Sequence, residues 1–231
     1  MNSILLFTLL AGHLASPSID QYTQPIKDIS FSMDPRTRNE GELQKISKDF
    51  ANAYSFGRVA FKIKDSFEIR GDGKVEGANV SMIEHDGVRV FRARGLKYPT
   101  DVRNKPGQRQ TIFDFGLLTP DLFSDFLTAR FVRDDRETGD VVFDVGFNPR
   151  YHDKTRFRIW VDPVKKFVAK KEWYGQNGDL KATFSFSDPI QADSFWVPTV
   201  ATIRNAEGNV AGVLNYTGFR VNTGLDDSIF K

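Results

Sequence analysis

Very few side chains in this sequence are of the types that carry out catalysis or bind metals. The chain has three histidines and no cysteine: His13 lies in an N-terminal apolar run, His85 at a predicted turn and His152 in a predicted loop. Histidine and cysteine are common metal ligands, and histidine is the most frequent general base, but both roles need several such groups together. His85 and His152 are therefore predicted to be exposed residues rather than parts of a metal centre or a catalytic pair.

Other catalytic patterns are equally scarce. The pair Gly71-x-Gly73 lacks the third glycine of a dinucleotide-binding loop and is typical of a hairpin turn. The adjacent acids Asp134-Asp135 and Asp226-Asp227 stand in polar segments, where carboxylates are usually solvated. We predict that the protein is not an enzyme and has no catalytic residue, no cofactor and no metal.

The composition indicates a globular protein with a large apolar interior. The 231 residues are 40% hydrophobic, and 32 Lys+Arg against 30 Asp+Glu give a net charge of +2. This balance lacks the basic excess that neutralises phosphates, so no nucleic-acid partner is expected. The chain has 21 Phe, whose rings carry no polar atom that needs a hydrogen bond.

The N-terminal segment is typical of export. Residues 4–12 (ILLFTLLAG) are uncharged and apolar, and polar sequence starts after Ala15-Ser16-Pro17. The run is far shorter than the roughly 20 residues that cross a bilayer. We predict a signal peptide over 1–15 and a single domain over 16–231; the alternative is a buried first helix. His13 stands where a lipoprotein would need cysteine, so a periplasmic protein without a lipid anchor is expected.

Turn signals recur along the remaining chain, and the segments between them alternate apolar and polar residues. In residues 141–148 every second residue is apolar, the period that places one face of a strand on a core. Further strands are predicted at 29–33, 58–63, 67–70, 79–83, 88–93, 156–161, 166–174, 182–186, 197–204 and 212–221. Twist accumulates over so many strands. We predict an α+β, mostly β protein: one antiparallel meander of about ten to eleven strands, curved into a half-barrel, with short helices covering its concave side.

Two helices are predicted with some detail. The first spans 39–54, where Asn39 and Glu42 form a capping-box pattern before apolar residues at helical spacing, namely Leu43, Ile46, Phe50 and Tyr54. The second spans 119–130 and begins with Thr119 as the cap and Pro120 at the first helical position. Residues 18–26 are a third candidate, interrupted by Pro25, and residues 95–106 are predicted to be a polar loop.

The most distinctive motifs lie in the second half of the chain: IWVDP at 159–163, KKEWY at 170–174, GDLK at 178–181, FWVPT at 195–199 and FRVNTGLDD at 219–227, followed by Phe230. These motifs resemble the outer-membrane lipoprotein-sorting proteins of the LolA type, and 22–33, 57–69 and 84–87 match more loosely. The resemblance implies a periplasmic carrier whose curved, unclosed sheet is lidded by short helices. It also implies a cavity that takes lipoprotein acyl chains from an inner-membrane release complex to an outer-membrane acceptor. Where those carriers have a lysine-arginine-proline sequence whose arginine helps to hold the lid shut, this chain has KIKD at 62–65.

The function predicted from these observations is a monomeric, non-enzymatic carrier of acyl chains of lipoproteins or lipids. Alternation and the helix at 119–130 suggest that the residues lining the acyl cavity are Phe31, Phe61, Phe67, Val90, Leu122, Phe123, Phe126, Phe143, Val145, Ile159 and Phe184. The alternative is an envelope-stress sensor or protein-binding scaffold of the same fold, with a filled core and no cargo transfer.

Overall fold

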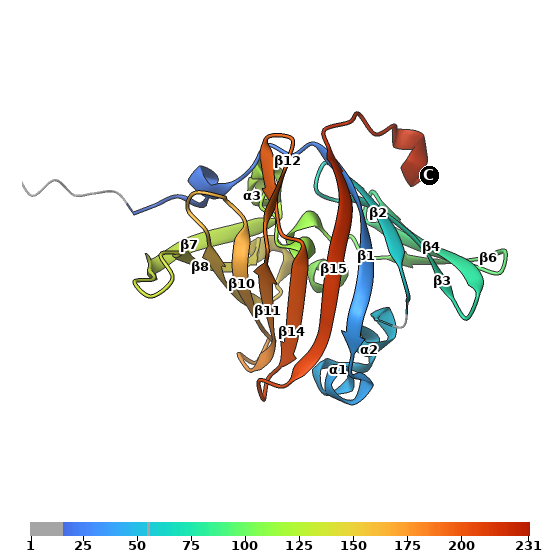
Figure 1. Ribbon diagram of the computed structural model, residues 1–231, viewed down its shortest axis with the longest axis horizontal. Helices are drawn as coiled ribbons and strands as arrows, with labels where there is room; N and C mark the ends of the chain where they lie inside the picture. Colours follow the sequence, from blue (N-terminus) through green and yellow to red (C-terminus); the bar gives the residue numbers. More distant parts are fainter. Residues whose placement is uncertain (1–15, 55) are drawn as a thin grey trace, which may run out of the picture.

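Strands make up most of the regular structure in the computed structural model, which describes residues 16–54 and 56–231 (Figure 1). The strands are β1 (Asp28–Arg38), β2 (Val59–Lys64), β3 (Glu68–Val75), β4 (Ala78–His85), β5 (Val88–Ala93), β6 (Leu96–Asp101), β7 (Leu127–Asp134), β8 (Val141–Phe147), β9 (Arg156–Val161), β10 (Val168–Tyr174), β11 (Leu180–Ser187), β12 (Ile190–Ala192), β13 (Phe195–Val197), β14 (Val200–Asn205) and β15 (Val210–Val221). The helices are η1 (Ile19–Tyr22), α1 (Glu40–Ile46), α2 (Lys48–Ala53), η2 (Pro106–Gln108), η3 (Ile112–Phe115), α3 (Pro120–Asp125), η4 (Pro149–Tyr151) and η5 (Asp227–Phe230). The predicted signal peptide at 1–15 lies outside the described residues. Within 16–54 and 56–231, no helix has the length and apolar character needed to cross a membrane.

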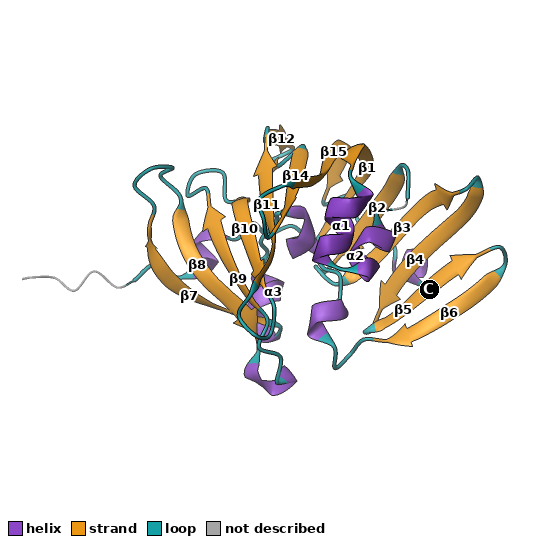
Figure 2. Cartoon of the chain, turned by 90° about the horizontal axis from the view of Figure 1, so that it is seen from below, coloured by secondary structure: helices purple, strands orange, loops and turns teal. Residues whose placement is uncertain are grey.

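Thirteen strands form one antiparallel sheet in the order β6-β5-β4-β3-β2-β1-β15-β14-β11-β10-β9-β8-β7, and β12 and β13 form a separate hairpin. The edge strands β6 and β7 do not pair with each other, so the sheet is not closed. Figure 2 shows it bent into a trough with α1, α2 and α3 on its concave side. This confirms the predicted mostly β, curved half-barrel, and each predicted strand overlaps a strand of the structure. The two strands of the sheet that the prediction missed, β6 and β7, are its edges.

The first and last strands of the chain are neighbours in the middle of the sheet. β1 and β15 pair antiparallel from Ile29 opposite Val221 to Arg38 opposite Gly212. The sheet is thus two meanders joined at this pair, and the expectation of a single meander is corrected. Pro35 in β1 lies at a register shift of this pair. A bulge is the place where an interior strand tolerates a residue without an N–H group.

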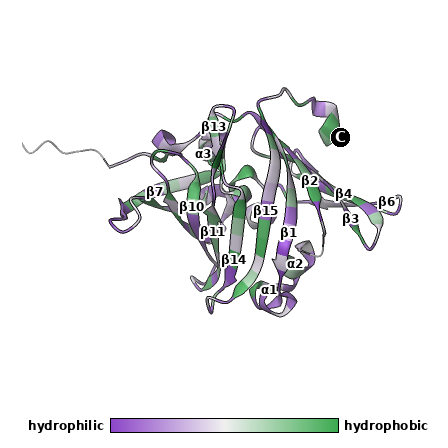
Figure 3. Cartoon of the chain, viewed as in Figure 1, coloured by the Kyte–Doolittle hydropathy of each residue, from purple (hydrophilic) through white to green (hydrophobic). Residues whose placement is uncertain are grey.

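Aromatic rings fill the core on the concave side of this central pair. The ring of Phe31 on β1 lies 5.0 to 5.6 Å, between ring centres, from four others: Phe61, Phe115, Tyr216 and Phe219. Tilted and edge-to-face ring pairs at such distances add to the stabilisation gained from burial. Figure 3 shows hydrophobic stretches mainly along the strands and hydrophilic ones mainly at the loops that join them.

The helix predicted over 39–54 is divided into α1 and α2 at Ser47. The backbone of Ser47 is extended, and its hydroxyl accepts a hydrogen bond from the Phe50 N–H at 3.0 Å, which starts α2. Asn39 caps α1 as predicted by accepting from the Glu42 N–H at 3.3 Å. The Glu42 carboxylate completes no capping box; it accepts from Asn205 instead. A serine favours caps over helix interiors because its hydroxyl competes for backbone groups.

The helix predicted over 119–130 ends early, because α3 covers only Pro120–Asp125 and β7 starts at Leu127. Thr119 occupies the cap position, but its hydroxyl makes no cap hydrogen bond and lies 2.6 Å from the Ser66 hydroxyl. Residues 127–131 extend as a strand against β8. This tertiary pairing outweighs the helical start signal, so the prediction of a twelve-residue lid helix was wrong.

The predicted loop at 95–106 contains the edge strand β6. Pro99 lies in the middle of this strand, which an edge tolerates because one side of it has no partner strand. Leu96 and Tyr98 are exposed, so no apolar face marked the strand in the sequence. The third helix candidate, at 18–26, is a single 3-10 turn, η1.

The C-terminal motif fastens the end of the chain to the start of β1. The buried Asp28 carboxylate accepts hydrogen bonds from the Thr223 N–H and the Gly224 N–H, each at 2.9 Å, and from the Thr223 hydroxyl at 3.1 Å. From there the chain runs to η5, which contacts β3 and β4 and buries Phe230. The part of the sequence that most resembles LolA-type proteins therefore stabilises the fold and does not form the cavity described below.

We expect Asp28→Ala to lower the free energy of unfolding by about 2–3 kcal/mol, because hydrogen bonds to a buried charged group stabilise a fold more than neutral ones do. The matched control is Asp34→Ala in the same strand, where the exposed Asp34 pairs with Arg58 at 3.6 Å; it should cost less than about 1 kcal/mol. Urea unfolding followed by tryptophan fluorescence measures both. Equal losses in the two variants would contradict the proposed clamp.

Candidate functional site

The concave side of the sheet encloses a cavity of about 1210 Å³. Small-molecule sites usually measure about 300–1,000 Å³, so this space is large enough for a long ligand. The apolar residues lining it come from both meanders and from the segments that lie between them: Met33, Phe50, Phe56, Val59, Phe61, Val75, Ala78, Val80, Met82, Phe91, Ala93, Phe113, Phe115, Phe126, Leu127, Phe147, Phe157, Trp173, Phe184 and Leu214. The core is therefore not filled by its own rings, which is the condition the carrier hypothesis requires.

Small residues keep the floor of this cavity open. Gly71 and Gly73 on β3 line it together with Ala78 and Ala93, and none of these carries a side chain that reaches across the trough. A Cβ atom at Gly71 would lie 3.0 Å from the Phe61 ring, so the glycine also lets that ring lie flat against the sheet.

The covers of the cavity come from two segments. Phe50 and Tyr54, on and directly after α2, stack with ring centres 4.8 Å apart, and Phe50 meets Phe184 of β11 at 6.0 Å. The second cover is the segment 104–111, which lines the opposite side. Figure 2 shows α1 and α2 at the concave side, between the two arms of the sheet. Among the α-helices that the structure describes, only α2 contributes lining residues, whereas α1 and α3 do not; the 3-10 helices η2 and η3 also line the cavity.

The structure brings only part of the predicted acyl site to this cavity. Phe61, Phe126 and Phe184 line it. Five other predicted residues are buried in the core without lining it: Phe31, Leu122, Phe143, Val145 and Ile159. Phe67 and Phe123 are half-buried against the same core, away from the cavity. That any of these residues contacts an acyl chain stays a prediction.

Val90 was assigned to the wrong face of β5. Its neighbours Arg89 and Phe91 line the cavity, and successive residues of a strand point to opposite faces. Both faces of β5 carry apolar residues, so alternation alone did not show which face points into the cavity. In β9, by contrast, Phe157 lies on the same face as the predicted Ile159, and Phe157 does line the cavity. Phe113 and Phe115 were missed because the short η3 has no periodic pattern.

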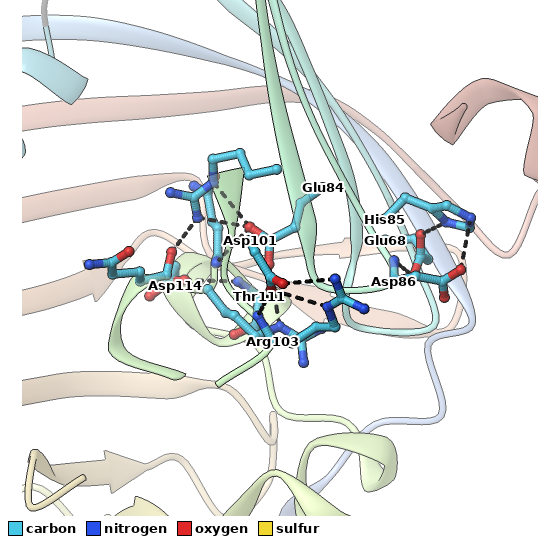
Figure 4. Close-up of polar contacts among 12 residues, drawn as sticks. Glu68, Glu84, His85, Asp86, Asp101, Arg103, Thr111 and Asp114 are labelled. Atoms are coloured by element: carbon cyan, nitrogen blue, oxygen red, sulfur yellow. Dashed lines mark hydrogen bonds and ion pairs between the residues drawn. The ribbon is translucent and has the colours of Figure 1, made fainter. Parts of the chain in front are cut away.

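A buried ion-pair cluster joins one cover of the cavity to the sheet. Glu84 on β4 is 0% exposed, and its carboxylate pairs with Arg89 at 2.8 Å and with Arg109 at 3.4 Å (Figure 4). The Arg109 guanidinium also lies over the rings of Phe67 and Phe126, 5.1 and 5.2 Å from their centres. Both arginines line the cavity. The wall of the cavity thus contains two arginine side chains that share one carboxylate.

A second polar cluster lies on the other face of the sheet. His85 contacts Glu68 through Nδ1 and Asp86 through Nε2, the latter at 3.3 Å (Figure 4). These three residues offer ligand atoms within 4.8 Å of one another, so they form a group that could hold a cation. Glu84 and His85 are successive residues in β4 and point to opposite faces, so this group does not reach the cavity. It therefore adds no reactive group to the cavity.

Comparison with solved structures finds the same fold in three proteins. A LolA superfamily protein from Nitrosomonas europaea aligns with a TM-score of 0.65 and 15% identity over 92% of this chain and 94% of that one. A domain from Vibrio parahaemolyticus named for outer membrane lipoprotein sorting aligns with a TM-score of 0.61, at 15% identity over 92% and 93%. A DUF1329 family protein from Desulfovibrio piger aligns with a TM-score of 0.60, at 13% identity over 92% of both chains.

The chain therefore has the fold of the LolA superfamily, and the resemblance seen in its sequence is confirmed at the level of the fold. A family model described as "Uncharacterized protein" matches residues 122–231, which include β7 to β15 and the tail. No curated protein sequence matches the chain.

We expect Glu84→Gln to lower the free energy of unfolding by about 3–5 kcal/mol, because it leaves two arginines without their buried counter-charge. The control is Asp101→Asn, which removes an exposed carboxylate paired with the exposed Arg103 at 2.7 Å and should cost less than about 1 kcal/mol. Chemical unfolding of both variants measures the difference. A loss below 1 kcal/mol in Glu84→Gln would show that the cluster does not hold this cover in place.

Proposed function

We propose that this protein is a carrier that binds acyl chains of lipoproteins or lipids in the cavity and releases them without any chemical step. The single observation that supports this most is the unfilled space of about 1210 Å³ on the concave side of the sheet, lined by aromatic and aliphatic side chains. Burial of a hydrocarbon chain contributes roughly 0.8 kcal/mol per methylene, so such a space has a high affinity for a long chain.

The shape of the site suits transfer as well as binding. The cavity is partly open, and its covers are two short segments, α2 and residues 104–111, rather than a closed layer of strands. A ligand that is fully enclosed would leave slowly, because its escape would require the loss of all its apolar contacts at once. A covered but incomplete enclosure supports binding at one membrane and release at another.

The names of the structural neighbours support the same cargo. One of them is named for outer membrane lipoprotein sorting, and a second belongs to the LolA superfamily. By analogy, we propose that this chain works in the periplasm after removal of a signal peptide, as a monomer, between an inner-membrane release complex and an outer-membrane acceptor.

The delipidated protein is expected to bind a fluorescent fatty acid and a triacylated lipopeptide, and organic extracts of the purified protein are expected to contain lipid by mass spectrometry. An envelope-stress sensor or protein-binding scaffold of the same fold would bind neither probe and would carry no lipid. Absence of binding together with lipid-free extracts would therefore reject the carrier and favour that second function.

We expect Met82→Trp to weaken binding of the triacylated lipopeptide by about tenfold, because a larger side chain there displaces about two methylenes of ligand, each worth roughly 0.8 kcal/mol. Met82 lies on the cavity floor, opposite Gly71 of β3 and Phe91 of β5. The matched control is Asn79→Trp in the same strand, at an exposed position that points to the other face. Fluorescence titration measures both variants, and unchanged affinity in Met82→Trp would place the ligand elsewhere.

A further inference from the structure

A single lysine is buried in the apolar wall of the cavity. Lys171 on β10 points to the concave side together with Trp173, and only 2% of it is exposed. Its Nζ lies 3.4 Å from Asp114 Oδ1 and 3.5 Å from the carbonyl oxygen of Phe113. Charge-assisted hydrogen bonds are usually about 2.7–2.9 Å long, and an ammonium group has three hydrogens to donate. Both contacts are long, so the hydrogen-bonding capacity of this group is not saturated.

Aromatic rings surround the ammonium group on its other sides. Nζ lies 4.6 Å from the ring centre of Phe113, 4.7 Å from that of Phe184 and 5.7 Å from that of Phe157. Attraction to the ring faces offsets part of the cost of burying the charge. Even so, burial lowers the pKa of Lys171. At this position a methionine of similar size would pack without the cost of burying a charge.

Two tyrosine hydroxyls belong to the same part of the cavity. Tyr54 and Tyr216 both line it, and Tyr216 is only 3% exposed. Within the described residues, no protein group forms a hydrogen bond with the Tyr216 hydroxyl, and this hydroxyl is not among the buried polar atoms that lack a partner, so it is open to the cavity. Burial raises the pKa of both, and the Asp114 carboxylate raises them further, so both hydroxyls keep their protons and are available as donors. A hydroxyl that faces a cavity can donate its hydrogen to an oxygen atom of a ligand.

We propose that the cavity takes an amphiphile with an anionic head group, whose oxygen atoms accept hydrogen bonds from Lys171, Tyr54 and Tyr216 while its hydrocarbon part lies among the Phe rings. This inference rests on the proposed function, because it concerns the same cavity, and it names the ligand class. The shared chemistry is a carboxylate or phosphate oxyanion at one end of a hydrocarbon chain.

The groups around Lys171 favour an anion over a cation or a neutral head, although Asp49, Glu76 and Asp153 also line other parts of the cavity. Lys171 and the two tyrosine hydroxyls all offer hydrogens. The nearby carboxylate, Asp114, is partly engaged, since its Oδ2 accepts from the Thr111 N–H at 2.9 Å. Elsewhere in the wall, Arg89 and Arg109 share the single carboxylate of Glu84, which leaves one positive charge in excess there. An oxyanion at Lys171 would supply the short contacts that the ammonium group lacks.

The test compares ligands with the same chain and different heads. Isothermal titration of the delipidated protein with dodecanoate, dodecyl phosphate and 1-dodecanol is expected to give affinities at least about tenfold higher for one or both anions than for the alcohol, the ratio that 1.4 kcal/mol of differential binding produces. The preferred anion identifies the source: a free fatty acid if it is dodecanoate, a phosphate head group if it is dodecyl phosphate.

Three variants test which side chains cause the preference for the anions over the alcohol. Lys171→Met should bring the anions within about threefold of the alcohol, Lys171→Arg should keep most of the preference, and Tyr216→Phe should reduce it in part, because each hydrogen bond to a charged group contributes separately. The matched control is Lys170→Met, the adjacent lysine of β10, which points outward over Trp160 at 4.0 Å and should change nothing. Circular dichroism establishes that each variant is folded, and Lys171→Arg and Tyr216→Phe remain informative if Lys171→Met is not.

The outcomes separate this inference from the proposed function. Equal affinity for all three ligands, or a preference that survives in Lys171→Met, overturns the anionic head group but leaves an apolar carrier. Failure of all three ligands to bind overturns both. Binding of the anions alone, abolished in Lys171→Met, supports the inference in its strongest form.

Discussion

The pairing of β1 with β15 is the interaction on which the remaining structure depends. It joins the meander β1 to β6 to the meander β7 to β15. Without this pairing, β1 and β15 would each have an unpaired edge. The ring cluster around Phe31 covers the concave side of this pair, and the Asp28 clamp secures its end. Because the two meanders diverge from this line, the hollow between them is a direct result of how the chain termini meet.

The strands inside the sheet could be predicted from the sequence because they are half-buried, and half-burial produces alternation, as in β2 next to the central pair. The edge strands β6 and β7 could not be predicted in this way. In β6 the exposed Leu96 and Tyr98 sit beside Pro99, and in β7 the start signal at Thr119-Pro120 favoured a helix that tertiary pairing cuts short. In both cases the deciding contact is made by residues distant in the sequence, which no local pattern contains.

The same limit explains how much of the site could be predicted. Alternation identifies an inner face, as for Phe61 and Phe184, but it does not say whether an inner residue meets another element or open space. Phe31 and Phe61 share that face and both meet Phe115, yet Phe61 lines the cavity and Phe31 does not. Phe31 is covered in addition by the rings of Tyr216 and Phe219. Lys171 was visible in the KKEWY motif, but its burial depends on Phe113 and Phe184 from other segments.

The open edges at β6 and β7 affect how the sheet can deform (Figure 2). A closed barrel has a fixed circumference, and widening its interior means breaking a ladder of backbone hydrogen bonds. An unclosed sheet can change its curvature by small adjustments of twist spread over many strands, with every ladder intact. The trough of this protein can therefore change its width while the hydrogen bonds between its strands are preserved.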